Sequence, residues 1–292
     1  SKRKGRTEDE YRRLITLHVL PALGHRKIGE VERAEIARLH LNLKGTPYQA
    51  NRVLAVLSKF FNWCEVRGLR PDGSNPCRHI EKYREAKRER FLSEVELGRL
   101  GQVLTETEQK GAEAPAVAAA IRLLIFTGAR LNEILTLQWS MIDVERRALR
   151  LPDSKTGAKT IHLNQPALEL LARLDRLAGN PFVIAGRKEA AHLINLEKPW
   201  RRVRTLAGLD DVRLHDLRHS FASVAAGAGL SLPVIGALLG HTQAATTARY
   251  AHLAADPIKA ANDEIGARIA AALATTGVSA KAEVTIGAER EA

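Results

Sequence analysis

Five short segments in the second half of the chain carry side chains able to act on a phosphodiester. Each places an arginine, lysine, histidine or tyrosine in a compact motif: Gly128-Ala129-Arg130, Ser154-Lys155-Thr156-Gly157, His215-Asp216-Leu217-Arg218-His219, Leu239-Gly240-His241 and Arg249-Tyr250. Taken singly, each segment is a weak signal. Taken together, they supply guanidinium groups, an amine, imidazoles and a phenol, which would suit one reaction on one phosphate.

The chemistry of these groups is complementary. Attack on a phosphodiester builds negative charge on the nonbridging oxygens, and Arg130 and Arg218 offer planar forks that match such oxygens. A tyrosine such as Tyr250, with an ordinary pKa of about 10, is a poor nucleophile until a base or nearby cations favour the phenolate. His215 and His241 belong to the residue type that titrates in the useful range.

The leaving 5′ oxygen needs a proton, and Lys155 in a polar turn is the candidate general acid. No set of acidic residues has convincing metal-ligand spacing, so arginine and lysine would do the work that Mg²⁺ does in other enzymes. No P-loop pattern occurs, and a tyrosyl-phosphate intermediate conserves bond energy, so rejoining would need no ATP. The sequence predicts neither a metal nor another cofactor.

Each candidate also has a structural interpretation. Arg130 resembles a surface arginine paired with Glu133 one turn on, and Lys155 alone resembles a solvated turn residue. His241 follows a helix end, where a capping or packing histidine is equally suited. Tyr250, by itself, would more often be a packing residue.

His215 and His219 have the spacing of the histidines in the H-E-x-x-H zinc motif. Asp216 stands where that motif needs glutamate, and its carboxylate is one methylene short for the general-base role. We therefore expect His219 to be structural, and a zinc hydrolase remains a rival that predicts bound zinc and loss of activity with chelator.

The ordered set resembles the tyrosine recombinase (phage integrase) family, whose catalytic residues fall on Arg130, Lys155, His215, Arg218, His241 and Tyr250. The flanking stretches TGARLNEILTLQW, SKTG, HDLRHSFAS and LLGHTQAATTARYAHL are similar to the family's boxes. Lys159 competes with Lys155 for the acid role, and Lys155 is preferred for its family-like Lys-Thr-Gly context. Family members commonly have arginine at position 159, a departure expected to be harmless.

The resemblance implies a site-specific recombinase that forms a covalent 3′-phosphotyrosyl intermediate with double-stranded DNA attachment sites. It implies a homotetramer on synapsed DNA, with a C-terminal helix near Pro257 to Leu273 docking on a neighbouring copy, and accessory bending or directionality factors. It also implies a bacterial or phage-encoded, nucleoid-associated protein of the cytoplasm. An arm-type DNA-binding domain is not visible from Ser1 onward. The rivals are a type IB topoisomerase and a noncatalytic DNA-binding protein on the same scaffold.

Charge points to a polyanionic partner. The 292 residues have a formal net charge of +12, which favours nucleic acid. Residues 1–90 carry 21 lysines and arginines against 11 acidic residues, whereas residues 91–292 carry 24 against 22. The front of the chain is therefore the expected DNA-binding part, with candidate contacts at Lys2, Arg3, Lys4, Arg52, Lys59 and Arg67.

Hydrophobic spacing predicts the elements that position these groups. In the basic part we expect helices from Thr7 to Leu20, ended by Pro21, from Arg33 to Leu43, and from Pro47 to Gly68. Two cysteines do not make a disulfide framework, and no apolar run reaches membrane-spanning length.

The second part is expected to be mixed α/β. Ser93 and Glu96 have capping-box spacing, and the predicted elements are a helix over 116–126, helical turns over 130–139, a hairpin over 148–151 and 159–163, and helices from 165 to 273. The predicted fold is mainly α with a small β-sheet or hairpin, as a two-domain C-shaped clamp. Its predicted parts are an all-helical core-binding domain (1–85), a linker (86–92), a catalytic domain (93–273) and a disordered tail (274–292).

Overall fold

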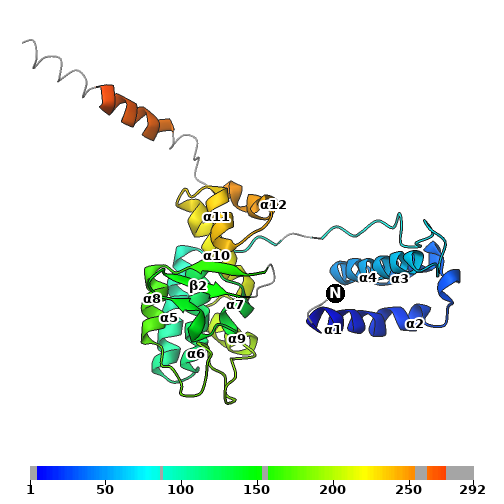
Figure 1. Ribbon diagram of the computed structural model, residues 1–292, viewed down its shortest axis with the longest axis horizontal. Coiled ribbons are helices and arrows are strands. Elements are labelled where there is room, and N and C mark those ends of the chain that lie inside the picture. The colour runs from blue at the N-terminus through cyan, green and yellow to red at the C-terminus, as the bar shows by residue number, and fades with distance from the viewer. Residues whose placement is uncertain (1–4, 86–87, 153–156, 254–261, 274–292) are drawn as a thin grey trace, which may run out of the picture. The chain divides into compact units, whose positions relative to one another are not determined.

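The computed structural model describes residues 5–85, 88–152, 157–253 and 262–273. Lys2, Arg3, Lys4, Lys155 and the tail 274–292 lie outside the described residues. The chain divides into two compact units, Ser1–Arg88 and Glu89–Ala292 (Figure 1). The fold is mainly helical, with one small antiparallel sheet in the second unit.

The first unit is all-helical. Its helices, apart from the 3-10 turn Ile28–Glu30, are α1 (Gly5–Leu14), a π-helical turn (Ile15–Val19), α2 (Leu20–Leu23), α3 (Arg33–Asn42) and α4 (Pro47–Val66). The prediction that Pro21 ends the first helix is wrong. Pro21 falls in the first turn of α2, directly after the π-helical turn, and the backbone is in the right-handed helical region at Leu14, Val19 and Leu20, so the helical run passes through Pro21 to Leu23.

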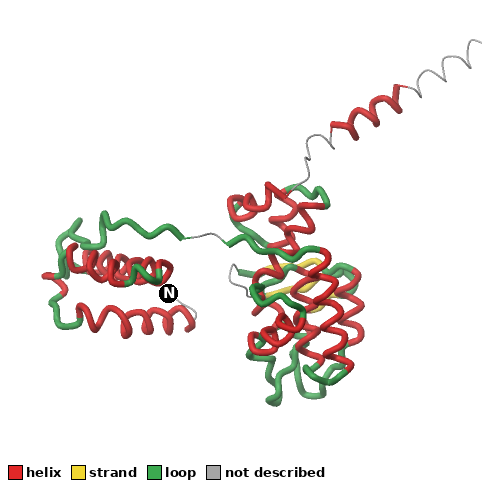
Figure 2. Tube along the Cα trace, turned by 180° about the vertical axis from the view of Figure 1, so that it is seen from behind, coloured by secondary structure: helices red, strands yellow, loops and turns green. Residues whose placement is uncertain are grey.

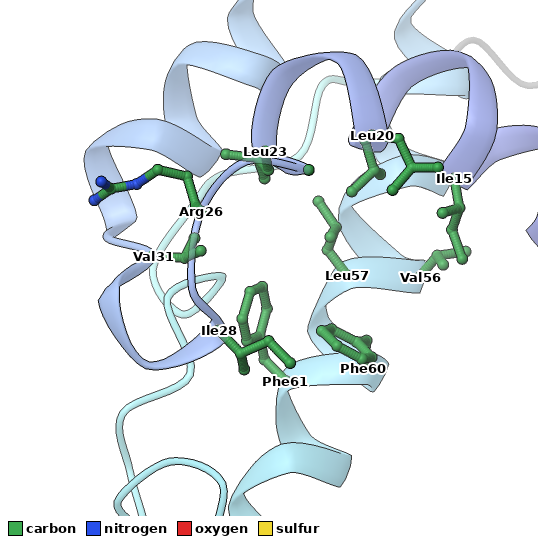
Figure 3. A pocket seen from close by; sticks show the side chains of 12 residues that line it. Ile15, Leu20, Leu23, Arg26, Ile28, Val31, Val56, Leu57, Phe60 and Phe61 are labelled. Atoms are coloured by element: carbon green, nitrogen blue, oxygen red, sulfur yellow. The ribbon is translucent and has the colours of Figure 1, made fainter.

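The long helix α4 is the centre of this unit. Its buried face includes Val53, Leu57 and Phe61, and these side chains pack against Leu14, Ile36 and other residues of the preceding helices. An apolar cavity of about 240 Å³ remains between α4 and the π-helix/α2 segment. Leu20, Leu57 and Phe60 line this cavity (Figure 3).

Buried polar residues fix the end of the first unit. The Asn51 side chain on α4 donates to the Tyr83 carbonyl and to Glu85 at 2.8 Å each, and its oxygen accepts from the Tyr83 N–H at 3.0 Å. The Tyr83 ring stacks on His40 with centroids 4.4 Å apart. The chain is therefore held to the helical unit as far as Glu85.

The second unit packs helices against one face of a three-stranded sheet, whose other face carries the exposed Arg150, Thr160 and His162. The strands pair antiparallel in the order β1 (Ile142–Asp143), β2 (Ala148–Leu151) and β3 (Lys159–His162), with Leu149 opposite both Ile142 and Ile161. The strands lie among the helices of this unit (Figure 2). The hairpin β2–β3 was predicted; β1, with only two residues, has too short a pattern to be seen in the sequence.

The helices of this unit cover the buried face of the sheet and form most of the core. They are α5 (Glu94–Gln109), α6 (Pro115–Thr127), α7 (Leu131–Leu135), α8 (Gln165–Arg173), α9 (Glu197–Leu206), α10 (Leu214–Gly227), α11 (Leu232–Leu239) and α12 (Ala244–Thr247), with 3-10 turns at Trp139–Met141 and Ala248–Leu253. The apolar helix α6 lies between α8 and α10. A separate cluster joins α10, α11 and the last 3-10 turn through Ala222, Leu239 and Tyr250.

Local signals set several of these boundaries. Ser93 and Glu96 make the predicted capping box at the start of α5. Gly128 ends α6 and Gly240 ends α11, both in the left-handed conformation. Within the described residues, no helix has the length and apolar character needed to cross a membrane.

Candidate active site

The end of α6 places Arg130 at the start of α7. Gly128 has φ +60°, and a Cβ there would lie 2.6 Å from the Phe221 ring, so this turn requires glycine. Arg130 is the N-cap of α7; its N–H donates to Glu133 at 2.9 Å and its guanidinium at 2.8 Å. The pairing with Glu133 that the sequence suggested is therefore present, in a half-buried site.

Arg218 joins three elements from its place on α10. Its guanidinium donates to the Gly128 carbonyl at 2.6 Å and to the Leu239 carbonyl at 2.7 Å. Burial lowers the pKa of Arg218 to about 10, and the like charge of Arg130 adds to the shift. The Arg218 guanidinium is therefore bonded to the backbone two residues before Arg130.

Lys159, which the sequence analysis set aside in favour of Lys155, lies inside this cluster. It is the first residue of β3, and its ammonium donates to Glu133 at 3.0 Å and to the Leu239 carbonyl at 3.2 Å. Burial lowers the pKa of Lys159, and Glu133 opposes that shift. Burial raises the pKa of Glu133, but bonds from Arg130 and attraction to Lys159 outweigh it, so the net shift is downward.

His215 and His219 project from α10 toward the nucleophile candidate. Their rings meet edge to face with centroids 4.9 Å apart. His219 Nδ1 lies 2.6 Å from the Tyr250 hydroxyl oxygen. Burial lowers the pKa of His219 to about 4, and it also lowers the pKa of His215. Burial therefore favours the neutral imidazole of His219.

Tyr250 is 4% exposed and packs against α10 and α11. Burial raises its pKa, while Arg249 and Arg218 act in the opposite direction. The phenol is thus enclosed, but it lies within electrostatic reach of Arg218. Through its contact with His219, the phenol is joined to α10, the helix that also carries Arg218.

His241 follows the left-handed Gly240 at the end of α11. Its N–H donates to the Gly236 carbonyl at 2.9 Å, and its Nδ1 lies 2.8 Å from the hydroxyl of Thr247. Burial lowers the pKa of His241 to about 4, with further contributions from Arg218 and Arg130. The backbone N–H and one ring nitrogen of His241 are therefore each engaged, and both guanidinium groups act on the charge of its ring.

Asp216 serves the start of α10. Its carboxylate accepts the Arg213 N–H at 2.9 Å and the Arg213 guanidinium at 3.1 Å. This carboxylate is fully buried and engaged in a cap, a poor arrangement for a general base at a zinc ion. Among the residues that the structure describes, no group of three or more His, Cys, Asp or Glu is placed to hold a metal ion.

The second unit therefore gathers five of the six predicted catalytic residues. They are Arg130, His215, Arg218, His241 and Tyr250. Three further contacts could not be foreseen from sequence: Lys159 with Glu133, His219 with Tyr250, and Thr247 with His241. The spacing of His219 from His215 was visible, but it suggested zinc, and nothing local indicated that Lys159 would be buried.

The predicted DNA contacts in the first unit lie on an exposed face. Arg52, Lys59 and Arg67 are all exposed on α4 or at its C-cap. Trp63 is exposed beside them, and the Arg67 guanidinium lies 5.4 Å from its ring centroid. This basic face with an aromatic side chain is suited to a nucleic-acid backbone.

Comparison with known sequences agrees with the geometry. The sequence model of the Phage integrase family matches residues 90–256. Tyrosine recombinase XerA of Saccharolobus solfataricus is 28% identical over 211 residues, covering 70% of this chain and 64% of the relative. Prophage integrase IntF of Escherichia coli is 27% identical over 47% of this chain and 30% of its own length. The chain thus spans less than two thirds of these two relatives.

Solved structures share the fold. A lambda integrase dimer bound to a COC′ core site aligns with a TM-score of 0.69 at 20% identity, over 85% of this chain and 89% of that one. The Tn1549 transposon integrase in complex with circular intermediate DNA aligns with a TM-score of 0.69 at 18% identity, over 89% of this chain and 94% of that one.

Proposed function

The chain belongs to the phage integrase family, and from this premise we propose that it is a tyrosine-type site-specific recombinase that cleaves and rejoins DNA. Tyr250 is the nucleophile, and Arg130 and Arg218 bind the scissile phosphate. One observation carries the assignment: Arg218 contacts the end of α6 next to Arg130, while the neighbouring His219 holds the Tyr250 phenol.

Cleavage is a balanced exchange at phosphorus. The Tyr250 oxygen attacks, the new oxygen–phosphorus bond forms, and the bond to the 5′ oxygen breaks, which leaves a 3′-phosphotyrosyl link and a 5′-hydroxyl. Lys155 donates the proton that the 5′ oxygen takes up. Attack by a 5′-hydroxyl of another strand reverses these steps and restores the phosphodiester, so ATP is not consumed.

The protein groups divide the remaining work. Arg130 and Arg218 neutralise the charge that develops on the nonbridging oxygens, a contribution of about 10²–10³ in rate for one donor of this type. The phenol must lose its proton, and His219 Nδ1 lies 2.6 Å from the phenol oxygen. Burial holds the pKa of His219 near 4 in the free protein, and the negative charge of the bound phosphate would raise that pKa so that the imidazole accepts the proton, with His215 and His241 as further bases.

The first unit is the non-catalytic DNA-binding part of the chain in this proposal. We assign core binding to this helical unit, with Arg52, Lys59 and Arg67 on α4 and the segment with Lys2, Arg3 and Lys4 on phosphates. The proposed assembly is a homotetramer on two synapsed sites. A C-terminal helix covers residues 262–273, and its Ile265, Ile269 and Leu273 are exposed, which supports docking on a neighbouring copy. A solved lambda integrase tetramer bound to a Holliday junction aligns with a TM-score of 0.64 and 20% identity.

A covalent-capture assay tests the proposal. A pool of random duplexes, first enriched for binding to the protein, is nicked so that a short 5′-hydroxyl fragment is lost after cleavage. Wild type is expected to give a denaturation-resistant adduct in EDTA, with tyrosine linked to a 3′ phosphate. Tyr250→Phe should bind the same DNA and give none. Relaxation of any supercoiled plasmid without strand exchange would instead indicate a topoisomerase, and loss of the adduct in EDTA would contradict the metal-free reaction.

A further inference from the structure

We propose that Lys159 is a positioning residue for strand cleavage: its ammonium neutralises Glu133 and ties β3 to the end of α11, so that Arg130 stays available to the scissile phosphate. The inference rests on the proposed function and deepens it, because it gives a role to a lysine that is distinct from the general acid Lys155.

Contacts to two different elements define the position of Lys159. Its Nζ lies 3.0 Å from a Glu133 oxygen on α7 and 3.2 Å from the Leu239 carbonyl oxygen at the end of α11. The side chains of Lys159 and Glu133 are only 7% and 6% exposed. A buried ion pair of this kind holds its geometry closely, because removing either partner leaves an uncompensated buried charge.

The backbone around Lys159 is shaped to receive it. Gly240 adopts φ +66°, and a Cβ at that position would lie 2.5 Å from Lys159 Cε. The glycine that ends α11 therefore leaves the space that the lysine stem fills. Placement of the ammonium therefore depends on two other segments, α7 and the end of α11, whereas a solvated surface lysine needs no such partners.

Charge balance explains why the ammonium matters to Arg130. Glu133 accepts from both the Arg130 guanidinium and Lys159. Without Lys159, Arg130 would be the remaining cationic partner of Glu133 among these contacts. The carboxylate would then bind the Arg130 guanidinium more tightly and compete with the phosphate for it. The Leu239 carbonyl would also retain only its bond from Arg218. Loss of one amine would thus disturb both guanidinium groups.

The experiment must separate positioning from proton donation. Lys159→Met, Lys159→Arg, Glu133→Gln and the double variant Lys159→Met/Glu133→Gln are compared in single-turnover cleavage. Each is given two nicked duplexes that differ only in the leaving atom, an ordinary 5′ oxygen or a 5′-bridging sulfur. Sulfur leaves as a stable thiolate without taking a proton, so it rescues the loss of a general acid and does not rescue misplaced arginines.

We expect Lys159→Met to slow cleavage on the order of 10²-fold on both duplexes. Lys159→Arg should retain most activity, because it keeps the charge and the donors. The double variant should be faster than Lys159→Met alone, since the competing carboxylate is gone. Lys155→Met is the matched control, whose defect sulfur should relieve. DNA affinity and melting temperature are measured for every variant.

Two results would overturn the inference while the proposed function stands. One is wild-type cleavage by Lys159→Met; the other is full rescue of that variant by the sulfur leaving group, which would make Lys159 the acid. If Lys159→Met is unfolded, the folded double variant decides: a defect as deep as that of Arg130→Ala would reject the charge-balance argument. Absence of any adduct with wild type would reject the proposed function itself.

Discussion

The Nδ1 atom of His219 lies 2.6 Å from the hydroxyl oxygen of Tyr250. His219 directly follows Arg218 on α10, and its ring meets that of His215 edge to face. One helix therefore carries an arginine for the phosphate and also holds the phenol that would attack it. The contact is partly buried, with Tyr250 enclosed and His219 half-buried.

Replacement of His219 by phenylalanine should harm both stability and cleavage. The change keeps a ring in the site but leaves the Tyr250 hydroxyl without this acceptor, at a cost of about 1–3 kcal/mol. We expect a lower melting temperature and adduct formation slowed by roughly 10-fold or more. His219→Gln, which keeps a hydrogen-bonding side chain, should be milder. Equal adduct rates for wild type and His219→Phe would show that the contact plays no part in the reaction.

Stability should fall as the pH drops below 6.5. His219 and His241 have pKa values lowered from 6.5 to about 4, chiefly by burial. Below about pH 6.5 the unfolded chain therefore binds more protons than the folded one. The free energy of unfolding should fall as the pH drops from there to about 4. Glu96, lowered from 4.5 to about 2 mainly by its bond to Arg90, acts only at lower pH.

Melting temperatures between pH 7 and 4.5 check this effect. His219→Gln cannot titrate, so its melting temperature should depend less steeply on pH in that window. A pH dependence identical to that of wild type would mean that His219 is not the buried neutral group described above.

Thr247 should control the orientation of His241. Its buried hydroxyl is 2.8 Å from His241 Nδ1, and a Cβ at Gly236 would come within 2.9 Å of the same hydroxyl. Which ring nitrogen of a histidine carries the proton is set by the partner of the other. Thr247→Val should therefore slow cleavage by roughly 10-fold or more with DNA affinity unchanged, while Thr247→Ser retains activity. Equal single-turnover rates for the valine and serine variants would contradict this role.

Gly128→Ala should destabilise the second unit. The left-handed backbone at this position strains any other residue by about 1–3 kcal/mol, and the new methyl group would press on Phe221. Gly98→Ala on α5 is the control, because nothing lies within 4 Å of its added Cβ; it should stabilise by about 0.4–1 kcal/mol. Chemical denaturation measures both. If Gly128→Ala lowered the free energy of unfolding by no more than about 0.3 kcal/mol, the packing between α6 and α10 would have adjusted to the added methyl group at little cost.

Removal of two charges from α4 should weaken the salt dependence of DNA binding. If Arg52 and Lys59 each neutralise a phosphate, the double glutamine variant lowers the log–log salt slope by about 2. Arg12→Gln, whose guanidinium is already paired with Glu8, should change it less. Fluorescence anisotropy at several salt concentrations gives the slope. An unaltered slope for the α4 variant would show that Arg52 and Lys59 do not contact phosphates and that DNA binds to another face.

Local signals predicted the fold to the extent that local chemistry decides it. Helix α4, the cap at Ser93 and the glycine ends of α6 and α11 follow from side-chain spacing and backbone freedom. The π-helical turn before Pro21 and the two-residue strand β1 depend on tertiary packing and leave no periodic pattern. The contacts of Lys159 and His219 could not be predicted for the same reason, because their partners are far away in sequence: Glu133 for Lys159 and Tyr250 for His219.

Helix α11 meets the cluster at several points along its eight residues. Its terminal carbonyl accepts from Arg218 and Lys159, Gly236 borders Thr247, and His241 begins directly after Gly240. A short rigid helix moves as one body, so a shift in its axis would change all of these contacts at once. We therefore expect the active arrangement of these side chains to form or to be lost in one step, together with a movement of α11.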